Sequence, residues 1–165
     1  MRSIYLLIVL AGIITFSSCR NDFETTASTG DLEFSRDTIF LDTVFTNIGS
    51  STYNLKVYNN SNENILIPSI NLENGQNSYY RLNVDGLYGN QNNSNNYFEN
   101  IELLAKDSLF VFIETTIDIT NFPNESNQFL YTDKIKFNTG YNSQTVDLIT
   151  LVKDAVFIYP NKYTD

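Results

Sequence analysis

Few residues in this chain have side chains suited to acid–base or metal chemistry. The 165 residues include no histidine and one cysteine, which removes the commonest general base and the commonest zinc ligand. Carboxylate pairs remain, such as Glu99 with Glu102 and Asp31 with Glu33, and glycoside hydrolysis uses two carboxylates. Nothing in the flanking sequence distinguishes these pairs from solvated strand ends. The sequence therefore predicts a protein that is not an enzyme and that has no cofactor or metal site.

The cysteine, Cys19, is the residue whose position indicates a specific chemistry. It follows Arg2, an apolar run over residues 4–14 and the small polar residues Ser17 and Ser18. A charged region, a short apolar region and small residues in this order are typical of a secretory signal. The apolar run is also shorter than the roughly 20 residues of a membrane-spanning helix. Residues 1–18 are therefore predicted to be a signal peptide that is removed.

The stretch "FSSC" resembles the lipobox of bacterial lipoproteins, with Phe16 where leucine is usual. The resemblance implies cleavage before Cys19, a diacylglycerol on its sulfur and acylation of the new amino group. Several acyl chains anchor a protein far more firmly than one. Arg20 stands where an aspartate would favour retention in the inner membrane, so the resemblance implies a lipid-anchored protein of the outer membrane, facing either the periplasm or the cell surface.

The net charge of −9 and the sequence pI of about 4.3 bear on the partners. A chain this acidic repels nucleic acid and anionic membrane surfaces. We therefore expect no nucleic-acid partner, and contact with the membrane only through the lipid on Cys19.

The rest of the sequence divides into a polar segment and a region of short strands. Residues 19–31 are polar and lack an apolar period, which predicts a flexible tether. From Leu32 to the end at Asp165, short runs rich in β-branched and aromatic residues alternate with turn sequences such as "NIGSS" and "TGYNS". This pattern predicts an all-β, antiparallel β-sandwich domain over residues 32–165. Residues 98–107 fit either a short helix or a strand ending in a turn.

Alternation within the runs indicates which faces meet water. Apolar residues at 53, 55 and 57 share one face of their strand, and Lys134 and Lys136 alternate with apolar neighbours. The lysines predict a solvated face and also suggest protection of a sheet edge. The run "LFVFI", residues 109–113, is apolar on both faces. It is either the central strand of a sheet or half of an exposed aromatic patch.

The order of runs over residues 38–152 resembles the Hydin-like (ASH) and PapD-like immunoglobulin modules. Gly49, the strand-ending Asn59 and the closing hairpin "TGYN" match features of these modules. The resemblance implies an immunoglobulin-like fold. A narrower resemblance, through "LEFSRDTIFLDTVFTNIGS", is to N-terminal domains of lipoproteins from Bacteroidota, some of which continue into a β-helix. The chain is then either a short relative or the front part of a longer surface lipoprotein.

The Asn-rich stretch over residues 86–97 is the longest polar segment. Its amide oxygens suit calcium, but Asp85 and Glu99 are the carboxylates that flank it, whereas calcium loops supply several. A flexible loop is the better interpretation. Four tyrosines surround this loop and are candidate sugar contacts, although β-propensity also explains them: Tyr79, Tyr80, Tyr88 and Tyr97.

Three further residues are candidates for modification. Thr38, Thr43 and Ser108 each follow an aspartate and precede an aliphatic residue. This pattern resembles the O-glycosylation sites of envelope proteins from Bacteroidota.

These observations favour a non-enzymatic, lipid-anchored module that contacts another envelope protein. Its contact surface is predicted to be an exposed sheet edge or the aromatic face of residues 109–113. The alternative is a glycan-binding accessory lipoprotein of a polysaccharide-uptake system. A subunit of a surface filament that exchanges a terminal strand is a third possibility.

Overall fold

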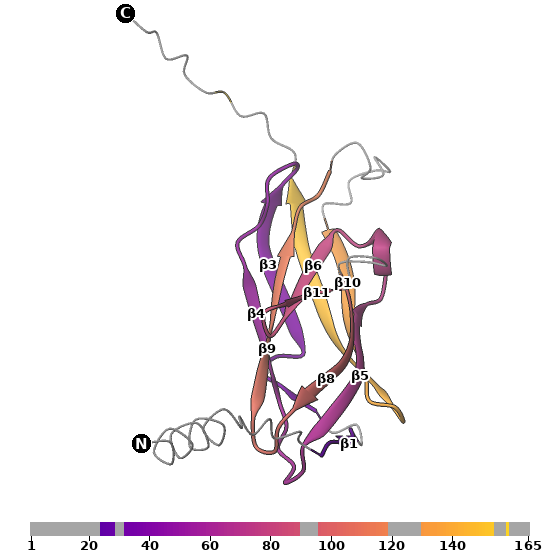
Figure 1. Ribbon diagram of the computed structural model, residues 1–165. Coiled ribbons are helices and arrows are strands. Elements are labelled where there is room, and N and C mark those ends of the chain that lie inside the picture. Colours follow the sequence, from indigo (N-terminus) through magenta and orange to yellow (C-terminus); the bar gives the residue numbers. More distant parts are fainter. Residues whose placement is uncertain (1–23, 29–31, 90–95, 119–129, 154–157, 159–165) are drawn as a thin grey trace, which may run out of the picture.

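The computed structural model describes residues 24–28, 32–89, 96–118, 130–153 and 158, which form two β-sheets packed face to face (Figure 1). The fold is the immunoglobulin-like β-sandwich that the sequence predicts. The signal-like segment 1–18, Cys19 and most of the final apolar run, residues 155–160, lie outside the described residues.

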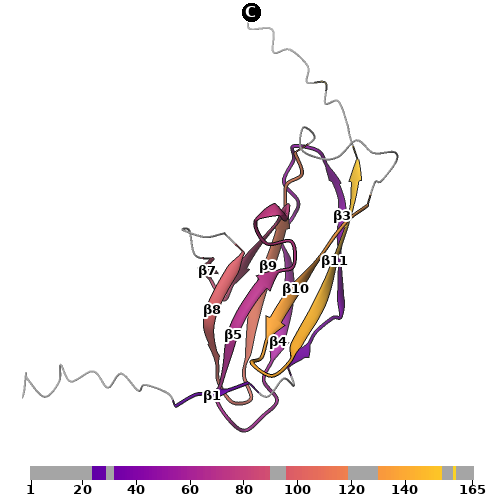
Figure 2. The same cartoon turned by 90° about the vertical axis from the view of Figure 1, so that its right-hand side faces the viewer.

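Six strands make up the first sheet, in which β5 has β8 on one side and β1 and β10 on the other (Figure 2). The order continues from β10 through β11 to β3, which lies at the edge. The strands are β1 (Thr26–Ala27), β3 (Thr38–Phe45), β5 (Ile65–Leu72), β8 (Tyr97–Leu103), β10 (Leu130–Asn138) and β11 (Ser143–Lys153).

The second sheet is antiparallel throughout, in the order β2-β4-β9-β6-β7. Its strands are β2 (Glu33–Phe34), β4 (Tyr53–Tyr58), β6 (Tyr80–Val84), β7 (Leu87–Tyr88) and β9 (Ser108–Thr115). A 3-10 turn, η1 (Gly75–Asn77), precedes β6. Residues 98–107 form part of β8 and then a turn in which Lys106 has φ 60°, so the helical alternative for this segment is wrong.

The N-terminal part of the described chain contacts both sheets. The N–H of Ser35 donates to Lys56 in one sheet, while the carbonyl of Asp37 accepts from Asp147 in the other. The chain therefore crosses between sheets over three residues, and β3 then runs parallel to β11. The strand β1 runs parallel to β5. Part of the predicted tether, residues 24–28, is thus attached to the sandwich, which corrects the boundary set at residue 31.

Alternating side chains of both sheets fill the core, as the period-2 pattern predicts. In β10, Ile135 and Phe137 are fully buried. Lys134 and Lys136 point outward and pair with Asp147 at 3.2 Å and Glu73 at 2.8 Å. However, β10 lies between β5 and β11. The solvated face is confirmed, and the interpretation of these lysines as edge protection is wrong.

Two of the features that carried the family resemblance have a structural role. Asn59 is buried, and its amide nitrogen donates to carbonyls of the β4–β5 loop and of the turn after β8. The "TGYN" turn joins β10 to β11, with Gly140 at φ 87°. Gly49 does not have a positive φ, so its position does not require glycine on conformational grounds.

Within the described ranges, no helix is both long enough and apolar enough to span a bilayer.

Candidate functional site

The outer face of the second sheet carries a cluster of exposed aromatic side chains. β9 is its central strand, so both predictions for residues 109–113 hold: Leu109, Val111 and Ile113 point into the core, and Phe110 and Phe112 point outward. The outward rings are 40% and 37% exposed and lie stacked, with centroids 6.0 Å apart and an interplanar angle of 16°.

Strand β4 extends this cluster on one side. Lys56 lies opposite Phe110 in the register, and its Nζ is 5.3 Å from the Phe110 centroid and 5.2 Å from that of Tyr58. A cation this close to two ring faces is attracted to both. We call Lys56, Tyr58, Phe110 and Phe112 the aromatic band.

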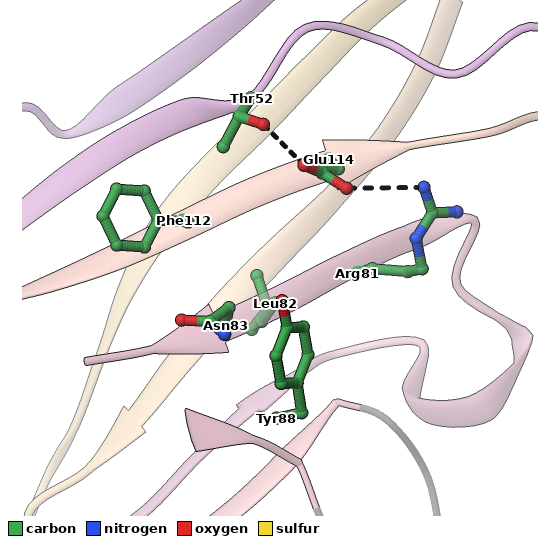
Figure 3. Close-up of a pocket in the computed structure, with 7 residues that line it drawn as sticks. All are labelled: Thr52, Arg81, Leu82, Asn83, Tyr88, Phe112 and Glu114. Atoms are coloured by element: carbon green, nitrogen blue, oxygen red, sulfur yellow. Dashed lines mark hydrogen bonds and ion pairs between the residues drawn. The ribbon is translucent and has the colours of Figure 1, made fainter. Parts of the chain in front are cut away.

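Next to the aromatic band, the same face is hollowed into a pocket of about 570 Å³, lined from β6, β7 and β9 and by Thr52 before β4 (Figure 3). The Glu114 carboxylate accepts a hydrogen bond from the Thr52 hydroxyl and lies 3.7 Å from the Arg81 guanidinium. The ring of Tyr88 stands beside Asn83. The described lining consists of Thr52, Arg81, Leu82, Asn83, Tyr88, Phe112 and Glu114.

The residues of this pocket suit binding better than bond cleavage. Among the described residues that line it, Glu114 is the one carboxylate, and it is already engaged by Thr52 and Arg81. A glycosidase needs two carboxylates at a set separation. The lining instead combines ring faces with a few polar groups, which is typical of small-molecule sites.

The four tyrosines predicted as sugar contacts do not form one platform. Tyr80 is fully buried, so its predicted contact with a surface ligand is corrected. Its ring stacks on Tyr131 at 5.1 Å, and Tyr79 meets the same ring edge-on at 5.2 Å. Tyr97 lies on β8 in the other sheet. Of the four, Tyr88 lines the pocket and is 81% exposed.

Burial also changes the chemistry of the tyrosine cluster. The pKa of Tyr80 is raised well above its usual range, first by burial, and its hydroxyl lies 2.8 Å from that of Thr150 and donates to the carbonyl of Tyr131. Burial likewise raises the pKa of Tyr79. Both hydroxyls therefore stay protonated at neutral pH, which excludes them as bases.

Each edge strand of the described sheets carries a feature that disfavours pairing with another chain. β1, β2 and β7 are two residues long, and β8 exposes Glu99 and Glu102. On β3, Asp42 and Thr43 lie opposite the single residue Leu151 of β11, which makes a bulge at these two residues. The Tyr53 hydroxyl also accepts the N–H of Asp42 at 2.9 Å. Of the two predicted contact surfaces, the aromatic face is thus the better supported.

The remaining candidates are dispersed. Thr38 and Thr43 lie on β3, where Thr38 is half-buried and Thr43 is exposed. Ser108 is half-buried at the start of β9. Glu33 lies on β2, while Asp31 and Cys19 fall outside the described residues. Within the described ranges, no group of three or more cysteine, aspartate or glutamate side chains is placed to hold a metal ion.

No protein-family model and no curated protein matches the sequence. Among solved structures, the chain is similar to a family 123 glycoside hydrolase from Clostridium perfringens, at 13% identity and a TM-score of 0.46 over 73% of this chain. It is also similar to the periplasmic chaperone SfaE, at 15% identity and 0.42 over 76% of this chain. The chain spans 23% of the hydrolase and 60% of the chaperone.

A third similar structure is the ASH/PapD-like domain 7 of human CEP192, at 12% identity and a TM-score of 0.43. The match covers 86% of this chain and 97% of that domain.

Proposed function

We propose that this chain is a non-enzymatic, lipid-anchored module of the bacterial envelope, and that the aromatic band contacts another envelope protein. In this proposal, acylated Cys19 holds the sandwich at the outer membrane. The lipobox-like sequence and the resemblance to lipoproteins from Bacteroidota support the anchor and its location.

The observation that carries the contact is the exposure of Phe110 and Phe112 side by side on the central strand of a sheet. Both point away from the core, and the fold leaves 40% of Phe110 and 37% of Phe112 exposed to solvent. Aromatic side chains at the centre of a contact contribute much of its binding energy. Lys56 and Tyr58 supply the polar groups expected around such a centre.

The lipid anchor is tested by replacing Cys19 with alanine. Cys19→Ala should abolish labelling by radioactive palmitate and release the protein from the membrane fraction, because no sulfur remains to receive diacylglycerol. An unchanged membrane fraction would contradict the anchor and leave the contact surface to be tested separately.

The contact surface is tested by placing a photo-crosslinking phenylalanine analogue at residue 110 in living cells. Crosslinking at 110 should give one adduct of defined mass with an envelope protein. The matched control is the analogue at Phe40, which is 66% exposed on the other sheet and should give none. The same adduct from both positions, or none from residue 110, would refute the proposed contact.

A further inference from the structure

We propose that the pocket between β9, β6 and β7 is a binding site for a neutral oligosaccharide. This goes beyond the protein contact, because the pocket adds Arg81, Asn83 and Tyr88 of β6 and β7 to a site that shares only Phe112 with the aromatic band. The outer face of the second sheet would then bind two ligands, a protein at the aromatic band and a sugar in the pocket.

Two ring faces are aligned across the strands of the pocket. The register places Phe112 opposite Asn83, and Asn83 opposite Tyr88. Phe112 and Tyr88 are thus two strand spacings apart, or about 10 Å, a distance that two sugar rings separated by a third ring can span. Each aromatic ring can pack against the C–H face of one sugar ring.

Polar groups border these rings where sugar hydroxyls would lie. Asn83 stands between the two rings in the register, and Arg81 and Glu114 face each other in the adjacent row. The Thr52 hydroxyl holds one oxygen of the Glu114 carboxylate. A guanidinium and a carboxylate offer paired donors and paired acceptors, which match vicinal hydroxyls that both donate and accept.

The charge of the pocket argues for a neutral ligand. Arg81 is matched by Glu114, so the described residues that line the pocket have no net charge, and the whole chain carries −9. An acidic sugar or a phosphate would be repelled at long range. The volume of about 570 Å³ also lies within the roughly 300–1,000 Å³ of small-molecule sites.

Tyr88 has little structural reason to be aromatic. It is 81% exposed on a two-residue strand, whereas the buried Tyr80 packs in the core. A ring this exposed contributes little apolar burial to the fold, and its position at the mouth of the pocket is explained by a ligand.

The test is isothermal titration calorimetry of the purified full-length protein with four neutral hexaoses, and with sialyllactose as an acidic comparison. The neutral sugars are cellohexaose, maltohexaose, xylohexaose and mannohexaose. At least one neutral oligosaccharide should bind, and Tyr88→Ala and Phe112→Ala should each weaken that binding by about tenfold or more. Tyr141→Ala is the matched control, because Tyr141 is 83% exposed in the turn after β10. This variant should bind like the wild type.

Far-UV circular dichroism confirms that each variant is folded before titration. No binding of any neutral hexaose at millimolar concentration, binding of sialyllactose alone, or equal effects of Tyr88→Ala and Tyr141→Ala would each overturn the proposal. The protein contact is judged separately from the crosslink at residue 110 in the Tyr88→Ala background. An adduct that persists there while sugar binding is lost supports two ligands on one face.

Discussion

Replacing Asn59 by alanine should destabilise the sandwich more than any exposed polar substitution, because this side chain joins two turns inside the protein. Its amide nitrogen donates to the carbonyls of Glu63 at 2.8 Å, Leu104 at 2.9 Å and Leu103 at 3.3 Å. Its amide oxygen accepts from both the N–H and the hydroxyl of Ser61. Asn59 is 2% exposed, so water cannot replace these bonds.

The magnitude follows from the number of bonds lost. A net hydrogen bond contributes about 0.5–1.5 kcal/mol, and a buried group left without a partner costs more. Losing the hydrogen bonds of two amide hydrogens and one amide oxygen should therefore lower the free energy of unfolding by about 2–4 kcal/mol. For a domain of this size, the melting temperature should fall by roughly 10 °C.

The decisive comparison is Asn59→Asp, which keeps the shape and the acceptor but removes the donor. A buried carboxylate facing three carbonyl oxygens should cost at least as much as alanine. The matched control is Asn60→Ala, since Asn60 is exposed, and this variant should stay within about 0.5 kcal/mol of wild type.

Because the chain has no tryptophan, urea unfolding is best followed by circular dichroism. A free energy of unfolding for Asn59→Asp within about 1 kcal/mol of wild type, roughly the value of a single hydrogen bond, would refute the role assigned to the amide donor.

Three further variants test other features of the fold. Asn96→Ala should speed amide exchange at Leu82, measured by NMR, because the Asn96 side chain accepts the Leu82 N–H at 3.1 Å and donates to the Tyr80 carbonyl at 2.9 Å; unchanged exchange at Leu82 would contradict this role. Tyr80→Phe should reduce the fall in the free energy of unfolding at alkaline pH. Because burial raises the pKa of Tyr80 in the folded protein, the contribution of the protonated hydroxyl is complete below about pH 10 and is lost as the pH rises further. Urea unfolding from pH 8 to 11 measures this difference. Gly140→Ala should cost about 1 kcal/mol at its positive φ, while Gly49→Ala should be near neutral by thermal melting, since its added Cβ meets its nearest atom at an ordinary 3.5 Å.

The strands were predictable where they are long enough to show alternation. Residues 53–58 and 130–138 alternate over several positions, so their faces follow from period 2. β1 and β7 have two residues each and show no period. The burial of Tyr80 could also have been predicted, because alternation places it on the same face of its strand as Leu82 and Val84, which point inward.

Sheet membership was not predictable from local pattern. Lysines on β10 indicate a solvated face, but an interior strand and an edge strand of a sandwich both have one. Likewise Arg81, Asn83 and Phe112 each alternate outward in their own strands, yet their meeting in one pocket depends on β6 pairing with β9. Such long-range pairing is decided by the whole chain, and so the pocket became visible only in the structure.

The outward positions of the second sheet show why the aromatic face indicates a function. In β4 and β6 these positions hold Asn54, Lys56, Arg81 and Asn83, which suit a solvated face, and Tyr58 at the end of β4. In β9 the inward residues already fill the core, so core packing does not require an aromatic residue at 110 or 112. Two adjacent phenylalanines there expose apolar surface to water, which favours aggregation unless a ligand covers it. The proposed protein contact would cover this surface and so offset the cost.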